Sequence, residues 1–116
     1  AVFLCERGFR SFDDHSRGTF DLSVVPVLRE LTHLPIIVDP SHATGRWQSV
    51  LPMARAGIAA GADGLMIEVH PNPAEAWADG EHPPLPERFS EQMMQVERIA
   101  LAGDRPVLHR NAESGK

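Results

Sequence analysis

Histidine and carboxylate side chains follow two strand-like apolar segments of this 116-residue chain. His42 ends the first segment, Glu68 lies near the end of the second, and Asp79 follows eleven positions further along. Imidazole nitrogens and carboxylate oxygens are ligands of divalent metal ions. The three residues are therefore candidate ligands of one metal ion, and composition leaves Mn²⁺, Fe²⁺, Co²⁺ and Zn²⁺ open.

Each candidate ligand also has a purely structural interpretation. A single histidine at the end of a strand is more often a hydrogen-bonded structural residue. Glu68, which we expect to be buried, would then form an ion pair with Arg46 or Arg7, because a buried carboxylate needs a cation or another partner. Asp79 stands between alanine and glycine, where an ordinary turn is the simpler interpretation.

Two arginines are candidate anion-binding residues. Arg7 directly follows another strand-like segment, at about residues 2–6. Its guanidinium fork suits a phosphate or a carboxylate. A salt bridge to Glu6, Asp13 or Asp14 is the alternative. Arg46 ends a loop that leads into a helix, and backbone N–H groups at a helix start attract anions. That signal is weak, because an ordinary turn has the same composition.

Apolar periodicity predicts three strand–helix units. The pattern also predicts a loop at 41–46 and a short helix at 73–77. Ser23 is the predicted N-cap of the helix that follows the first strand. The helix after the first strand has an apolar face formed by Val24, Val27, Leu28 and Leu31. The predicted strands cover about 2–6, 36–39 and 64–69, and the longer helices about 23–32, 47–60 and 86–102.

This order of elements predicts an α/β fold with a parallel sheet, as in a (β/α) barrel, where chemistry gathers at the carboxyl ends of the strands. A complete barrel takes roughly 250 residues, so we expect this chain to be a piece of one. The chain also begins with Ala1 inside a strand-like run. We expect residues 1–102 to form barrel units and 103–116 to be a tail, a short strand or a disordered end.

Composition narrows the functional classes. The net charge of −5 argues against a general nucleic-acid surface, which is normally basic. The single cysteine, Cys5, excludes an intrachain disulfide and fits a reducing cytoplasm. No apolar run approaches the roughly 20 residues of a membrane helix. We therefore expect a cytoplasmic protein that acts on small molecules.

Four segments together closely resemble the C-terminal part of class I 3-deoxy-D-arabino-heptulosonate 7-phosphate (DAHP) synthases. They follow one another in the family's order, and the resemblance covers about residues 1–102. The segments are 4–12 (LCERGFRSF), 19–26 (TFDLSVVP), 34–46 (LPIIVDPSHATGR) and 61–73 (GADGLMIEVHPNP).

The resemblance implies the last three units of a (β/α)₈ TIM barrel. The family condenses phosphoenolpyruvate with erythrose 4-phosphate, which is the first step of the shikimate pathway. It uses one divalent metal ion, for which we expect Mn²⁺. His42, Glu68 and Asp79 match three of the metal ligands, whereas Cys5 does not match the cysteine ligand. Arg7 matches an arginine that contacts phosphoenolpyruvate.

The resemblance leaves two alternatives. The related 3-deoxy-D-manno-octulosonate 8-phosphate synthase shares the barrel and the phosphoenolpyruvate chemistry, although residues 5–8 and 39–45 favour DAHP synthase. The second alternative is that the isolated chain is a non-catalytic fragment. In the family, one metal ligand and most substrate contacts lie in the other part of the barrel. We expect Arg7 and His42 to be catalytic, Arg46 to bind substrate, and the complete protein to be a homo-oligomer.

Overall fold

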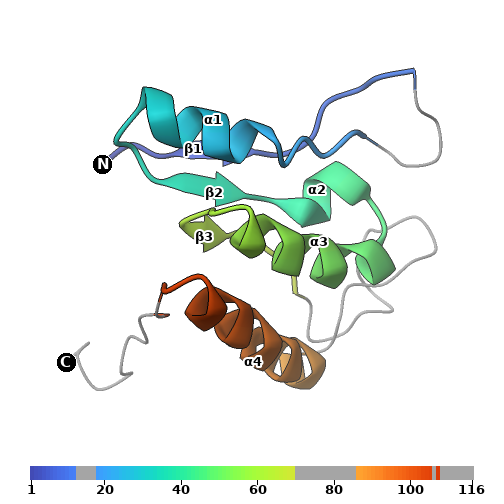
Figure 1. Ribbon diagram of the computed structural model, residues 1–116. Helices are drawn as coiled ribbons and strands as arrows, with labels where there is room; N and C mark the ends of the chain where they lie inside the picture. The colour runs from blue at the N-terminus through green and yellow to red at the C-terminus, as the bar shows by residue number, and fades with distance from the viewer. Residues whose placement is uncertain (13–17, 70–85, 106, 108–116) are drawn as a thin grey trace.

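The computed structural model describes residues 1–12, 18–69, 86–105 and 107 (Figure 1). Strands and helices alternate along most of this part of the chain, as the sequence predicts. The described elements are β1 (Leu4–Glu6), α1 (Val24–Leu31), β2 (Ile36–Val38), α2 (Pro40–Thr44), α3 (Trp47–Ala59), β3 (Gly64–Leu65) and α4 (Pro86–Ala102).

The three strands form a parallel sheet in the order β1-β2-β3. Cys5 is aligned with Ile37, and Val38 is aligned with Leu65. Consecutive strands are parallel because a helix lies between them along the chain. The carboxyl ends of β1 and β2 therefore lie at one edge of the sheet, the edge from which α2 emerges (Figure 1). The prediction of an α/β fold with a parallel sheet is confirmed.

The core lies between the sheet and its helices. Ile36 and Val38 point into it, packed with Val25 and Ala62. Helix α3 approaches β2 so closely that a Cβ atom on Gly57 would lie 2.6 Å from Cγ2 of Val38. Apolar surface removed from water stabilises this packing by about 25 cal/mol per Å². Burial of β2 fixes the position of the loop and helix that follow it.

Helix α1 buries a different face from the predicted one. Val25 is fully buried, whereas Val27 and Leu31 are 53% and 76% exposed. Ser23 stands at the N-cap position of α1, as predicted, but its side chain makes no capping hydrogen bond. Asp21 accepts a hydrogen bond from the backbone N–H of Ser23 instead. In α4, Val96 and Ala100 are buried.

Two predicted boundaries at the carboxyl edge of the sheet are also wrong. The segment 41–46 was expected to be a loop, but residues 40–44 form helix α2. Asp39 caps this helix through its side chain and Pro40 stands at its first position, a combination that favours a helix start. Strand β3 ends at Leu65 rather than at 69. The predicted helix at 73–77 lies outside the described residues.

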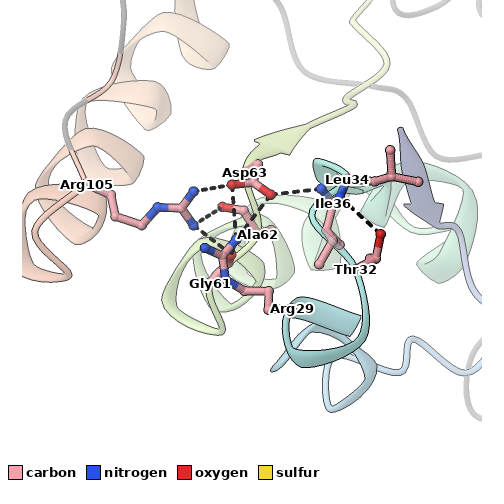
Figure 2. A network of polar contacts seen from close by, with 8 residues as sticks. All are labelled: Arg29, Thr32, Leu34, Ile36, Gly61, Ala62, Asp63 and Arg105. Atoms are coloured by element: carbon pink, nitrogen blue, oxygen red, sulfur yellow. Dashed lines mark hydrogen bonds and ion pairs between the residues drawn. The ribbon is translucent and has the colours of Figure 1, made fainter. Parts of the chain in front are cut away.

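The opposite edge of the sheet is held by Asp63, at the start of β3 (Figure 2). Its carboxylate accepts hydrogen bonds from Arg29 of α1, from Arg105 beyond α4, and from the backbone N–H of Ile36. Arg105 also donates to the carbonyl groups of Gly61 and Ala62. The network thus links α1 and the segment that follows α4 to the starts of β2 and β3. Arg105 takes part although it follows the predicted boundary at residue 102.

These contacts set the acidity of Asp63. Burial alone would raise the pKa of this carboxyl group, but the hydrogen bonds from Ile36, Arg105 and Arg29 outweigh it and lower the pKa below its usual value. The ionised form of Asp63 is therefore the form that the fold stabilises. Within the described ranges, no helix is long and apolar enough to cross a membrane.

Candidate functional site

A fully buried carboxylate, that of Asp39, connects two of the predicted site residues. Its Oδ2 atom lies 2.6 Å from Nδ1 of His42 and 3.2 Å from Nε of Arg7. Its Oδ1 atom accepts a 3.1 Å hydrogen bond from the backbone N–H of His42. Arg7 and His42 come from different βα units, so Asp39 joins the ends of β1 and β2.

Local backbone contacts place these three residues. The backbone N–H of Asp39 donates to the carbonyl of Glu6 at 2.8 Å, which extends the β1–β2 pairing by one bond. The carboxylate of Glu6 then accepts a 2.7 Å bond from the backbone N–H of Gly8. Gly8 has φ of +86° and lies against Ala43 of α2. Arg7 thus lies between Glu6 and Gly8, and these contacts fix the backbone on both sides of it.

Arg7 and His42 line a shared pocket of about 190 Å³. Their side chains are 54% and 50% exposed, although the carboxylate that joins them is fully buried. Arg10 adds a second guanidinium to the wall. A pocket with two arginines and a histidine suits an anionic ligand such as a phosphate or a carboxylate. The remaining lining residues are Gly8, Phe9, Gly18 and Ala43.

Glu68 lies beside α2 but is exposed, so the expectation that it is buried is wrong. Its backbone N–H donates to the hydroxyl of Ser41 at 2.9 Å. Ser41 directly precedes His42 in the chain, so the structure brings the backbone of Glu68 close to the His42 helix. For Arg7, the ion pair that the structure shows is with Asp39 rather than with Glu6.

Arg46 lies at the end of the turn that joins α2 to α3, and it is exposed. The hydroxyl of Thr44 donates to the carbonyl of Pro40 at 2.8 Å and also contacts the carbonyl of Arg46. Gly45 makes the turn with φ of +64°. Helix α3 then begins at Trp47, where the sequence predicted it.

The hydrogen bond to Asp39 determines which nitrogen of His42 could bind a metal ion. An ionised carboxylate oxygen can only accept, so Nδ1 of His42 is the donor, and in the neutral imidazole the lone pair then lies on Nε2. Metal-binding histidines commonly donate their other ring N–H group to such a carboxylate. No group of three histidine, cysteine, aspartate or glutamate side chains is placed to hold a metal among the described residues. Asp79 lies outside them, so the complete ligand set stays a prediction.

Cys5 has the properties of a packing residue. It is a free, partly buried thiol in β1. Burial raises the pKa of this thiol, and the negative charge of Asp39 raises it further. A thiol with a raised pKa is a poor metal ligand, because only the thiolate binds well.

Asp39 is the site residue to which the sequence reasoning assigned no role. The local signal was present. Asp39 precedes Pro40, and its side chain can accept a hydrogen bond from the backbone N–H of His42. That signal predicts a helix start. The pairing with Arg7, 32 positions away, depends on the alignment of β1 with β2 and has no local signature.

The chain matches the DAHP synthetase I family over residues 1–102. It is 46% identical over 101 residues to the phospho-2-dehydro-3-deoxyheptonate aldolase of Thermotoga maritima, covering 87% of this chain and 30% of that protein. It is 31% identical over 117 residues to a 2-dehydro-3-deoxyphosphooctonate aldolase of Fusobacterium nucleatum, covering 91% and 40%.

Solved structures agree with the sequence relatives. The crystal structure of the Thermotoga maritima DAHP synthase superimposes with a TM-score of 0.85 at 45% identity, covering 91% of this chain and 31% of that one. A truncated form of that enzyme also superimposes with a TM-score of 0.85, and this chain covers 40% of its length. The chain thus spans less than half the length of these relatives. With residues 1–102 matched, the chain belongs to the DAHP synthetase I family.

Proposed function

We propose that this chain forms the C-terminal three βα units of a (β/α)₈ barrel that makes DAHP and phosphate from phosphoenolpyruvate, erythrose 4-phosphate and water. Family membership and the parallel β1-β2-β3 order support the proposal. The polar site also follows the carboxyl ends of β1 and β2, where barrel enzymes carry their chemistry. In this proposal the protein is cytoplasmic, starts aromatic amino-acid biosynthesis and assembles as a homo-oligomer.

The pairing of Arg7 with His42 through Asp39 is the observation that carries the proposal. It places a guanidinium and an imidazole on the wall of one pocket. Arg7 binds the phosphate of phosphoenolpyruvate and orients its enol carbon. Arg10 adds positive potential, and Arg46 contacts a substrate phosphate. Such charged donors work best when they are held in place before the substrate arrives.

His42, through Nε2, Glu68 and Asp79 would hold one divalent metal ion, with Mn²⁺ as the expected ion. When bound, the ion supplies Lewis-acid polarisation of the aldehyde oxygen of erythrose 4-phosphate. Asp39 keeps the Nδ1 proton of His42 in place, and Arg7 balances phosphate charge near the reacting carbons. The fourth ligand that the family resemblance implies, a cysteine, would come from an earlier barrel strand.

A comparison of aldehyde substrates tests the reaction. The complete barrel is incubated with phosphoenolpyruvate, Mn²⁺ and either erythrose 4-phosphate or arabinose 5-phosphate, and the phosphate released is measured. We expect release that depends on erythrose 4-phosphate and on metal. A preference for arabinose 5-phosphate would favour the octulosonate alternative and contradict the proposal. The 116-residue chain alone should be inactive, and DAHP formation by it would contradict the assignment of essential groups to the other barrel units.

A further inference from the structure

We infer that Asp39 is a positioning residue, which fixes the metal ligand His42 and the substrate-binding Arg7 against a single carboxylate oxygen. The inference rests on the proposed function for the roles of those two residues. It goes further by assigning the buried carboxylate of Asp39 a role in fixing the positions of both residues.

Both carboxylate oxygens of Asp39 accept hydrogen bonds from residues of the site. Oδ2 receives both Nδ1–H of His42 and Nε–H of Arg7, and Oδ1 receives the backbone N–H of His42. The side chain is fully buried, so protein donors rather than bulk water satisfy the carboxylate. A buried carboxylate without such donors would be costly. The three donors and Asp39 therefore hold one another in a defined arrangement.

For His42 the consequence is a fixed tautomer. With Nδ1 donating to Asp39, the lone pair of the neutral imidazole lies on Nε2, in a side chain that is 50% exposed. The second bond from Asp39, to the backbone of the same residue, fixes the first turn of α2 as well. Asp39 thus sets both the protonation pattern and the direction of the imidazole.

For Arg7 the consequence is a fixed guanidinium plane. The Nε–H group is used by Asp39, which leaves the four N–H groups of the two terminal nitrogens for an anion in the pocket. A lysine has no second group of this kind and cannot bind Asp39 and a phosphate with the same geometry. Because Arg7 and His42 share Oδ2, displacement of either changes the acceptor available to the other.

The Asp39→Asn variant is the sharpest test, because it keeps the side-chain shape and changes a carboxylate oxygen to an N–H donor. An amide nitrogen in place of Oδ2 cannot accept from Nδ1, so His42 should move its proton to Nε2, where it blocks metal binding. In the complete barrel we expect Mn²⁺ affinity to fall about 10- to 100-fold. The KM for phosphoenolpyruvate should rise as Arg7 is released. Asp104→Asn, an exposed carboxylate after α4, is the matched control and should change neither value.

Three readouts separate this role from simple stabilisation. Mn²⁺ affinity is measured by electron paramagnetic resonance of the free ion, and circular dichroism checks that the variant is folded. Nitrogen-15 NMR of the metal-free wild type reports the His42 tautomer without any variant. Protonated Nδ1 with unprotonated Nε2 supports the inference. The reverse tautomer in the wild type, or unchanged Mn²⁺ affinity in a folded Asp39→Asn variant, would overturn it.

These outcomes also separate the inference from the proposed reaction. If the wild type forms no DAHP while Asp39→Asn still switches the tautomer and weakens Mn²⁺ binding, the reaction is wrong and the positioning role stands. If the wild type forms DAHP and Asp39→Asn binds Mn²⁺ and phosphoenolpyruvate normally, the positioning role is wrong and the reaction stands.

Discussion

Gly8 and Ala43 lie in direct backbone contact, at the point where the chain leaving β1 crosses α2. A Cβ atom built on Gly8 would be 2.7 Å from Cα and 2.8 Å from Cβ of Ala43. Gly8 follows Arg7 and Ala43 follows His42, so this contact sets the separation of the two site residues. Only a residue without a side chain permits it at φ of +86°.

The Gly8→Ala substitution should therefore destabilise the fold and disturb the site. We expect a loss of about 1–3 kcal/mol in the free energy of unfolding, from the left-handed backbone and the clash together. Urea denaturation of the purified protein measures it. Gly103→Ala is the matched control, because its Cβ would make only ordinary 3.6 Å contact. Equal stability of the two variants would show that the Gly8–Ala43 contact is not as close as described.

Asp63 should make stability depend on acid pH. Its pKa is lowered in the folded state from the ordinary value of 3.8, so the unfolded state binds more protons between the two values and stability rises with pH there. Asp63→Asn should cost about 1–2 kcal/mol at neutral pH. The difference between wild type and variant should be complete above the ordinary pKa and shrink as pH falls through the lowered one.

Thermal or urea unfolding at several pH values measures this difference. Asp104→Asn is the control, since Asp104 is exposed and its substitution should shift stability by less than about 0.5 kcal/mol. A difference for Asp63→Asn that stays constant down to the most acidic pH would contradict the proposed role of its charge.

The Arg7→Lys substitution should affect phosphoenolpyruvate binding more than folding. Lysine keeps the positive charge but cannot pair with Asp39 and present a two-pronged donor to an anion. We expect the KM for phosphoenolpyruvate in the complete barrel to rise on the order of tenfold, with little change in unfolding free energy. Steady-state kinetics with Arg98→Lys, an exposed position on α4, as control would check it. An unchanged KM would remove Arg7 from the substrate site.

Removal of either proposed metal ligand should abolish metal-dependent turnover. His42→Ala deletes the proposed Nε2 ligand, and Glu68→Ala deletes the carboxylate of an exposed residue whose backbone contacts α2. Circular dichroism checks that both variants are folded, because His42→Ala also removes a donor from the buried carboxylate of Asp39. A chelator should inactivate the wild type in the same way, and added Mn²⁺ should restore it. Near-normal activity in either variant would contradict the ligand assignment.

The order of strands and helices could be predicted from sequence because each element leaves a local apolar pattern. The starts of α3 and α4 also came out correctly, at Trp47 and Pro86. The buried face of α1 did not, since Val25 rather than Val27 faces the sheet. Periodicity gives the existence of a helix, but packing against β2 decides its rotation.

The candidate site was predictable only in part. His42 and Arg7 could be chosen as single residues at strand ends, and the structure brings them to one pocket. Asp39, which joins them, was missed because the pairing depends on two strands being aligned residue by residue. The exposure of Glu68 was missed because β3 ends at Leu65, so that Glu68 is no longer part of a buried strand.

The location of a bound Mn²⁺ ion tests the central claim most directly. We would crystallise the complete barrel with Mn²⁺ and find the ion by anomalous scattering. We expect a peak about 2.0–2.3 Å from Nε2 of His42, with Glu68 and Asp79 as oxygen ligands and Nδ1 of His42 still bonded to Asp39. A peak bound to Nδ1, or away from His42 and Glu68 altogether, would contradict it.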